Sequence, residues 1–144
     1  MFPPLDKKGN LPEGIYQASL AEVLTHFGVG SARRKWLGER LRELFALAQS
    51  TGKLHRAFLW GSYATAKESP NDLDVLLVMT EDFSLDQLRQ DQGALFDYAQ
   101  ARIRFHADVF WTKVSIGQEV LSLWLDTYQI DKDMNRRGIV EVVT

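Results

Sequence analysis

Two aspartates that stand two positions apart at the start of an apolar run are the residues of this sequence best suited to chemistry. Asp72 and Asp74 lead into the run from Val75 to Met79. Alternate side chains of a β-strand point to the same face of a sheet, so the two carboxylates would lie together. Such a pair is unfavourable unless a positive charge lies between the carboxylates. Because carboxylate oxygens suit Mg²⁺ or Mn²⁺, the pair predicts a divalent metal site.

A glycine–serine pair before the aspartates is suited to holding a phosphate. Gly61 and Ser62 follow an apolar stretch, residues 55–60, that is typical of a strand. Glycine has no Cβ to keep a phosphate from the backbone, and a helical turn beginning at Ser62 would direct free N–H groups at an anion. Lys67 adds a positive charge to the same stretch. We expect Gly61, Ser62 and Lys67 to bind phosphate, with an ordinary strand-to-turn glycine as the alternative.

A third carboxylate, Asp108, completes the candidate site. Residues 102–111 alternate in character, which predicts a strand. Its polar face carries Arg102, Arg104, His106, Asp108 and Phe110. We expect Asp108 to bind metal or to act as the base that activates an incoming hydroxyl, with a solvated aspartate as the alternative. For Arg104 and His106, which share its face, a structural or solvated role is favoured over contact with a triphosphate.

The remaining patterns predict the elements that must position these residues. A proline-rich arm, 1–14, is expected to lie over the body, and Ser19 with Glu22 forms a capping-box pattern. In chain order, the patterns predict helix 19–27, helix 31–50, strand 55–60, strand 73–79, a helix that begins at 84 and includes 99, strand 102–111, helix 115–128 and strand 139–143. This order predicts an α/β (α+β) fold, in which a small mixed β-sheet has helices packed mainly on one side.

Helical spacing also predicts which faces of the helices are buried. The helix from 84 would bury Leu85, Leu88, Leu95, Phe96 and Ala99. The helix over 115–128 would begin with a box of Ser115 and Gln118 and would bury Ile116, Val120, Leu123 and Trp124. The basic side of the helix over 31–50 is expected to be solvated, with a rim for a polyanion as the alternative. That side holds Arg33, Arg34, Lys35, Arg40 and Arg42.

Composition bounds the class of protein. The 144 residues predict one domain, 1–144, in which 1–30 form an arm and short helix packed on the body. A net charge of −2 excludes a protein that coats nucleic acid by charge alone, and the lack of cysteine excludes disulfides and thiolate ligands. We expect a cytoplasmic protein with no membrane contact, because no secretory signal is present and no apolar run approaches the ~18 residues of a membrane span.

The candidate site resembles that of the DNA polymerase beta nucleotidyltransferase superfamily, in particular its minimal members, which are often encoded beside HEPN proteins as toxin–antitoxin pairs. The resemblance rests on Gly61-Ser62, on Asp72-Leu73-Asp74 before an apolar strand, and on an isolated strand aspartate, Asp108. It implies the fold of that superfamily and transfer of a nucleotide from an NTP with Mg²⁺ or Mn²⁺. Gly61 and Ser62 would hold the triphosphate, with Lys67 beside them, and the three aspartates would hold two metal ions. The flanks 11–15 and 137–140 also resemble an uncharacterised bacterial family of nucleotidyltransferase-like proteins.

The resemblance implies an enzyme that transfers an NMP, with ATP as the expected donor, to an acceptor hydroxyl. A partner protein of a toxin–antitoxin pair is the favoured acceptor, and an RNA end or a small molecule such as an aminoglycoside is the alternative. The segment from Tyr63 to Asn71 lacks the second glycine that commonly follows Gly-Ser. This departure favours a second hypothesis, a non-catalytic antitoxin or interaction module of the same fold that acts by direct binding.

Overall fold

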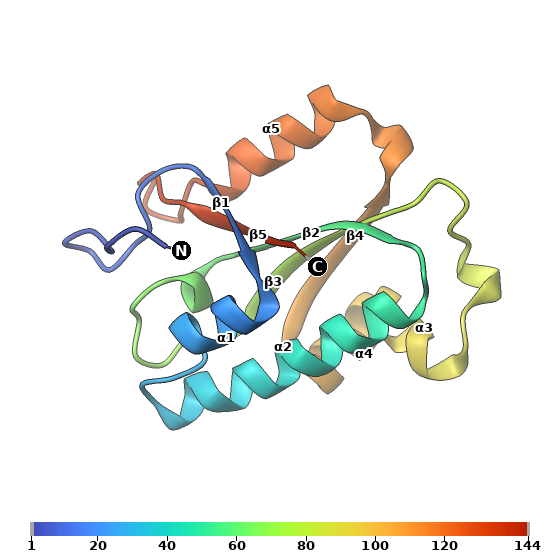
Figure 1. Ribbon diagram of the computed structural model, residues 1–144, viewed down its shortest axis with the longest axis horizontal. Helices are drawn as coiled ribbons and strands as arrows, with labels where there is room; N and C mark the ends of the chain where they lie inside the picture. Colours follow the sequence, from blue (N-terminus) through green and yellow to red (C-terminus); the bar gives the residue numbers. More distant parts are fainter. Residues whose placement is uncertain (1, 144) are drawn as a thin grey trace.

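The computed structural model describes residues 2–143, which fold as one mixed β-sheet with helices on both faces (Figure 1). The sheet has the strand order β1-β5-β2-β3-β4. The strands are β1 (Ile15–Ser19), β2 (Leu54–Trp60), β3 (Leu73–Met79), β4 (Ala107–Lys113) and β5 (Ile139–Val143). β1 runs parallel to β5 and β3 runs parallel to β4, whereas β2 is antiparallel to both of its neighbours. The predicted fold class, a small mixed sheet with helices, is confirmed.

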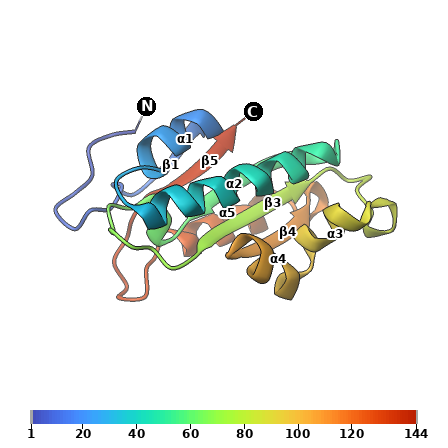
Figure 2. The same ribbon diagram turned by 90° about the horizontal axis from the view of Figure 1, so that it is seen from below.

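The helices divide unequally between the two faces of the sheet. Among the described residues they are α1 (Leu20–Phe27), α2 (Ala32–Ser50), α3 (Gln90–Phe96), α4 (Tyr98–Phe105) and α5 (Gln118–Tyr128). Figure 2, in which the sheet is seen from below, shows α1 to α4 in front of it and α5 behind it. The predicted packing of helices mainly on one side therefore holds, with α5 as the exception.

Two hydrophobic cores follow from this layering. β3 sends Val75 and Leu77 into the larger core under α1 to α4, and it sends Leu76 and Val78 into the smaller core under α5. Because consecutive residues of a strand point to opposite faces, a strand buried on both sides has no polar alternation. The unbroken apolar run of β3 in the sequence therefore indicates a strand that is buried on both faces.

The N-terminal arm packs against the loop that follows β2. Asn10 forms a β-bridge with Thr65, and the carbonyl oxygen of Gly9 accepts a hydrogen bond from the amide of Ala66 at 2.8 Å. The side chain of Leu11 is fully buried. The arm leads directly into β1, an edge strand that the sequence patterns did not predict. No helix within residues 2–143 has the length and apolar character needed to cross a membrane.

The strand predicted over 102–111 is wrong in its first half. α4 continues to Phe105, His106 adopts a left-handed conformation with φ of 53°, and β4 begins at Ala107. Asp97 caps α4 by accepting a hydrogen bond from the amide of Gln100 at 3.0 Å. Residues four positions apart are buried on one face of α4, and this packing outweighs the local alternation that predicted a strand. Arg102 and Arg104 therefore lie on a helix.

Two predicted helix faces also need correction. The helix expected from 84 is a short 3₁₀ turn, Leu85–Gln87, followed by α3 and α4, and Leu85 is half exposed. Ala99 is exposed as well. α5 begins only at Gln118, because the 3₁₀ turn Val114–Ile116 and Gly117 precede it, so Ser115 does not cap it.

The later start of α5 is accompanied by a different buried face. Leu121 and Leu125 are buried in α5, whereas Val120 and Leu123 are exposed, contrary to the prediction. Ile116 and Trp124, which were predicted to be core residues, are only partly buried against the smaller core.

Candidate active site

The parallel pairing of β3 with β4 brings the predicted aspartates together. Asp74 and Asp108 are direct register partners across the two strands. Asp72 lies two positions before Asp74, and its charge acts on the Asp74 carboxyl. Strand register therefore assembles three side chains that are up to 36 positions apart in the chain. Four of the six predicted site residues, Gly61, Ser62, Lys67 and Asp74, line one cleft, whereas Asp72 and Asp108 do not line it.

The electrostatics of Asp74 are those of a carboxyl with too little positive charge around it. Burial first, and then the negative charges of Asp108 and Asp72, raise the pKa of Asp74 to about 7. Arg137 acts in the opposite direction, because its positive charge lowers that pKa. An under-compensated cluster of carboxylates at a cleft is a typical setting for a cation or for proton transfer.

Cationic and hydroxyl side chains of the chain itself bind the other two aspartates. Arg102 donates a hydrogen bond to Asp108 Oδ1, and its Nη2 lies 3.6 Å from Asp72 Oδ1. His106 Nδ1 lies 3.3 Å from the same Asp72 oxygen. The hydroxyl of Tyr98 donates to Asp108 Oδ1 at 2.7 Å. The α4 segment and its C-cap thus cover the outer part of the carboxylate cluster.

The carboxylate oxygens of Asp72, Asp74 and Asp108 suit a hard divalent cation, but they do not surround a single point. Within residues 2–143, no group of three or more His, Asp or Glu side chains is arranged to hold a metal ion. Asp74 and Asp108 are adjacent oxygen donors that suit Mg²⁺. A set of three ligands would require Arg102 to release Asp72 and Asp108.

Gly61 lies directly against the partly buried carboxylate of Asp74. Its φ is +83°, a conformation that favours glycine, and a Cβ at this position would lie 2.1 Å from Asp74 Oδ2. The chain then enters a 3₁₀ turn, Ser62–Ala64, as predicted for a helical turn at Ser62. No other residue type would allow this close approach of the turn to Asp74, so the glycine links the expected phosphate loop to the carboxylates.

A buried arginine holds this loop in place. Arg34 in α2 is 5% exposed, which corrects the prediction that its side of the helix is solvated. Its guanidinium donates to the carbonyl oxygens of Phe27, Ser62, Tyr63, Thr65 and Lys67. Burial lowers the pKa of Arg34, and backbone carbonyls rather than a carboxylate bind its guanidinium.

Neighbouring residues at the start of α2 fasten the other end of the same connection. Arg33 Nε donates to the carbonyl of Pro70 at 3.0 Å, and Ser31 Oγ donates to the carbonyl of Glu68 at 2.7 Å. The first turn of α2 therefore positions the whole segment between Gly61 and Asp72. No local sequence pattern distinguishes Arg34 from the arginine and lysine beside it, so its role was missed.

The Gly61–Ser62 turn opens on a cleft of about 610 Å³. Its other walls come from the arm and from the turn after α5. The lining residues that the sequence patterns did not single out are Lys8, Asn10, Thr65, Asp131, Lys132, Asp133, Asn135 and Arg137. Lys8 Nζ donates to Asn135 Oδ1 at 3.0 Å, which joins the two walls. With Lys67, the cleft presents four cationic side chains against three aspartates, Asp74, Asp131 and Asp133. This small excess of positive charge suits a phosphate group.

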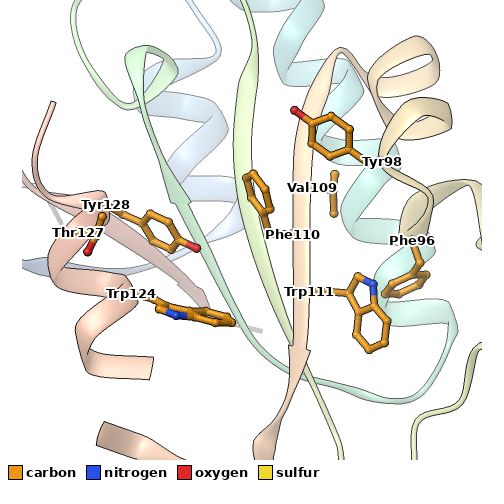
Figure 3. Close-up of a pocket in the computed structure, with 8 residues that line it drawn as sticks. All are labelled: Phe96, Tyr98, Val109, Phe110, Trp111, Trp124, Thr127 and Tyr128. Atoms are coloured by element: carbon orange, nitrogen blue, oxygen red, sulfur yellow. The ribbon is translucent and has the colours of Figure 1, made fainter. Parts of the chain in front are cut away.

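A second cavity of about 450 Å³ lies beside Tyr98 (Figure 3). It is lined by Phe96, Tyr98, Val109, Phe110, Trp111, Trp124, Thr127 and Tyr128. Figure 3 shows Phe110 between Tyr98 and the aromatic rings of α5. The ring of Tyr128 also stacks on Trp60, with centroids 3.7 Å apart. None of the lining side chains is charged, so this cavity suits a flat, neutral group.

Comparison with known proteins assigns the chain to a family. Residues 3–143 match a family described as a family of unknown function (DUF6932), and the chain belongs to that family. No curated protein and no solved structure matches the chain.

Proposed function

We propose that this protein is a metal-dependent nucleotidyltransferase that transfers a nucleoside monophosphate from an NTP to an acceptor hydroxyl. One observation carries the proposal: Gly61 begins a turn that lies against the partly buried carboxylate of Asp74, and Asp74 is the register partner of Asp108. A loop suited to phosphate and a pair of carboxylates suited to a cation are thereby joined in one site. The resemblance in sequence to the polymerase beta superfamily supports the same reading.

The Gly61-Ser62 turn and the three aspartates have different roles in this proposal. The turn at Gly61-Ser62 binds the triphosphate with its backbone, and Lys67, Lys8 and Arg137 supply positive charge from the walls of the cleft. Asp74, with Asp72 and Asp108, would hold Mg²⁺ or Mn²⁺, which neutralises charge on the phosphates when bound. Asp108 accepts the proton of the acceptor hydroxyl as its oxygen bonds to the α-phosphorus and pyrophosphate leaves.

The acceptor and the cellular compartment are further parts of this proposal. We favour a hydroxyl on a partner protein of a toxin–antitoxin pair in the cytoplasm, with ATP as donor and RNA as the alternative acceptor. The neutral lining of the cavity beside Asp108 is unsuited to a polycation such as an aminoglycoside. This lining argues against an aminoglycoside as the acceptor.

Labelling by α-³²P NTPs tests the proposal. The full chain is incubated with each labelled NTP, Mg²⁺ and cell lysate, and the labelled macromolecule is separated and identified. We expect one NTP to label an acceptor, and we expect the Asp72→Ala/Asp74→Ala variant to lose this label. An Asp86→Ala/Asp91→Ala variant, altered at exposed aspartates, is the matched control and should retain it. Equal labelling by both double variants would refute the proposed site.

A non-catalytic interaction module is the second candidate. It is favoured by the contacts of Arg102, whose guanidinium pairs with both Asp72 and Asp108 within the chain. In that case a folded Asp72→Ala/Asp74→Ala variant would keep its full biological activity and would bind its partner as the unaltered protein does. Loss of activity in this variant, with partner binding retained, would instead favour the enzyme.

A further inference from the structure

The hydroxyl of Tyr98 is hydrogen-bonded to Asp108, the proposed base. Tyr98 is the first residue of α4, its side chain is 51% exposed, and its hydroxyl donates to Asp108 Oδ1 at 2.7 Å. This distance is within the range that general base catalysis requires between a base and the proton it removes. Tyr98 thus occupies the position in which an acceptor hydroxyl would have to lie.

The fold makes little use of this side chain. Tyr98 is outside both hydrophobic cores, and among the described residues its ring lies 6.0 Å from Phe110 at a tilt of 45°. The hydroxyl of Tyr98 donates a hydrogen bond to Asp108 Oδ1, so the phenol already points at the carboxylate that would remove its proton. A neutral, exposed phenol that rests on a carboxylate base is chemically suited to act as a nucleophile.

We propose that the protein transfers a nucleoside monophosphate to its own Tyr98, an inference that rests on the proposed function. The phenolic oxygen of Tyr98 forms a bond to the α-phosphorus of the NTP. The bond from that phosphorus to the oxygen bridging the β-phosphorus breaks, and pyrophosphate leaves. The phenolic proton passes to Asp108. The product is a tyrosyl phosphodiester, and no oxidant or further reactant is needed.

The aromatic cavity beside Tyr98 accommodates the base of the transferred nucleotide. In Figure 3, Tyr98 stands at the upper edge of the cavity, and Phe110 and Tyr128 extend into it from β4 and α5. Phe110 is 42% exposed, so its ring is accessible for stacking. Aromatic rings stack on any nucleobase through its flat face, whereas the lining has no positive charge to attract phosphates.

Mass spectrometry of the purified full chain tests the inference. The protein is incubated with Mg²⁺ and each NTP in turn, and modified peptides are sequenced. We expect the mass of one nucleoside monophosphate on Tyr98. Tyr98→Phe should reduce self-labelling by about tenfold or more. Tyr16→Phe alters a residue of the edge strand β1 whose hydroxyl donates to the carbonyl of Pro12, and it should not reduce self-labelling. Full labelling of Tyr98→Phe would overturn the inference.

Mixing two variants separates transfer within one chain from transfer between chains. Tyr98→Phe retains the proposed site, and Asp74→Asn retains Tyr98. We expect no label on Asp74→Asn in this mixture, and we expect labelling of the unaltered protein at a rate independent of its concentration. Label on Asp74→Asn in the mixture would show transfer between copies and would overturn transfer within one chain.

A measurement that needs no turnover keeps the two proposals distinguishable. Paramagnetic Mn²⁺ with an NTP should broaden the ring resonances of Tyr98 in a protein with isotope-labelled tyrosines, and it should broaden them more than those of Tyr16. If both resonances stay sharp and no NTP binds, the proposed function fails and self-modification fails with it. If Mn²⁺ broadens Tyr98 and yet no label appears on it, self-modification is overturned while the proposed function stands.

Discussion

Glu141 and Asp74 are two carboxylates in the same sheet, and their surroundings are opposite. Glu141 on β5 accepts hydrogen bonds from both Nε and Nη2 of Arg56, at 2.8 and 3.0 Å. These bonds are the main reason that the pKa of Glu141 lies below its ordinary value. Asp74 on β3 lies against Gly61 and faces Asp108, and burial is the first cause that raises its pKa to about 7.

The difference separates a carboxylate that stabilises the fold from one that is available to a ligand. A bidentate arginine satisfies Glu141 within the chain, so nothing further has to bind there. Among residues 2–143, Asp74 has no such partner, and its negative charge is costly in the folded protein until a proton or a cation binds. We infer that Asp74 lowers the stability of the folded protein and that it is retained because the proposed binding site requires its carboxylate.

Breaking the ion pair on β5 should have the largest effect on stability. Glu141→Gln leaves the Arg56 guanidinium without its carboxylate, and we expect the free energy of unfolding to fall by about 3–4 kcal/mol. Arg56 is partly exposed, which places the loss toward the lower end for a buried pair. Chemical denaturation measures it. The Arg56→Met/Glu141→Met variant should recover most of the loss, and a loss as large as that of Glu141→Gln would contradict this account.

Neutralising Asp74 should change stability in the opposite direction. Asp74→Asn removes a charge that the folded state disfavours, and we expect a gain of about 2–3 kcal/mol near pH 8, from ~1.4 kcal/mol per pKa unit reduced for partial exposure. Below about pH 4 the carboxyl is protonated in both states, so the gain should vanish. Between about pH 4 and 7 only the unfolded chain releases the proton, so the stability of the unaltered protein falls and the gain grows.

Denaturant titrations of both proteins across this pH range measure the effect. A gain that is already present at low pH would point to a packing effect instead of a charge effect. Destabilisation at high pH would contradict the view that Asp74 is under-compensated.

Two glycines distinguish backbone strain from damage to the site. Gly61 and Gly117 have φ of 83° and 89° and extended ψ of −167° and 151°, a region almost restricted to glycine. Substitution of either by alanine should cost about 1–3 kcal/mol of stability. Only Gly61→Ala should also abolish nucleotide binding, because its Cβ would collide with Asp74 Oδ2. Beyond the chain neighbours of Gly117, a Cβ there would meet no described atom within 4 Å. Equal nucleotide binding by both variants would show that the Gly61 turn is not part of the site.

Releasing the carboxylates from α4 should have the smallest effect. Arg102→Ala removes the cation that contacts both Asp72 and Asp108, and we expect Mn²⁺ to bind about 3–10-fold more tightly, as the strength of exposed ion pairs suggests. Arg104→Ala is the matched control, because Arg104 lies on the same helix but contacts the carbonyl of Asp91. Weaker Mn²⁺ binding by Arg102→Ala would show that Arg102 supports the site instead of competing for it.

The parts of the fold that follow from local pattern could be predicted from the sequence. β2, β3 and β5 lie where runs of apolar residues indicated strands, and Ser19 caps α1 as the sequence pattern predicted. Asp74 and Asp108 are each the second residue of their strands. Because β3 pairs with β4 in parallel, the two aspartates are register partners.

The parts that depend on long-range contacts could not be predicted. Alternation over 102–111 suggested a strand, but residues four apart, Ala101 and Phe105, are both buried in α4. Arg34 meets carbonyls about 30 positions away, and nothing near it in the sequence indicates this contact. Lys8 and Arg137 line the cleft only because the arm and the turn after α5 meet there.

Calorimetric titration of the full chain with each NTP tests the central claim most directly. The claim is that the Gly61 turn and the Asp74 carboxylate form one site for a nucleotide with its metal. We expect one or more NTPs to bind in the presence of Mg²⁺ or Mn²⁺ and not in the presence of a chelator, and we expect folded Asp74→Asn to lose this binding. Failure of the folded, unaltered protein to bind any NTP with either metal would contradict the claim.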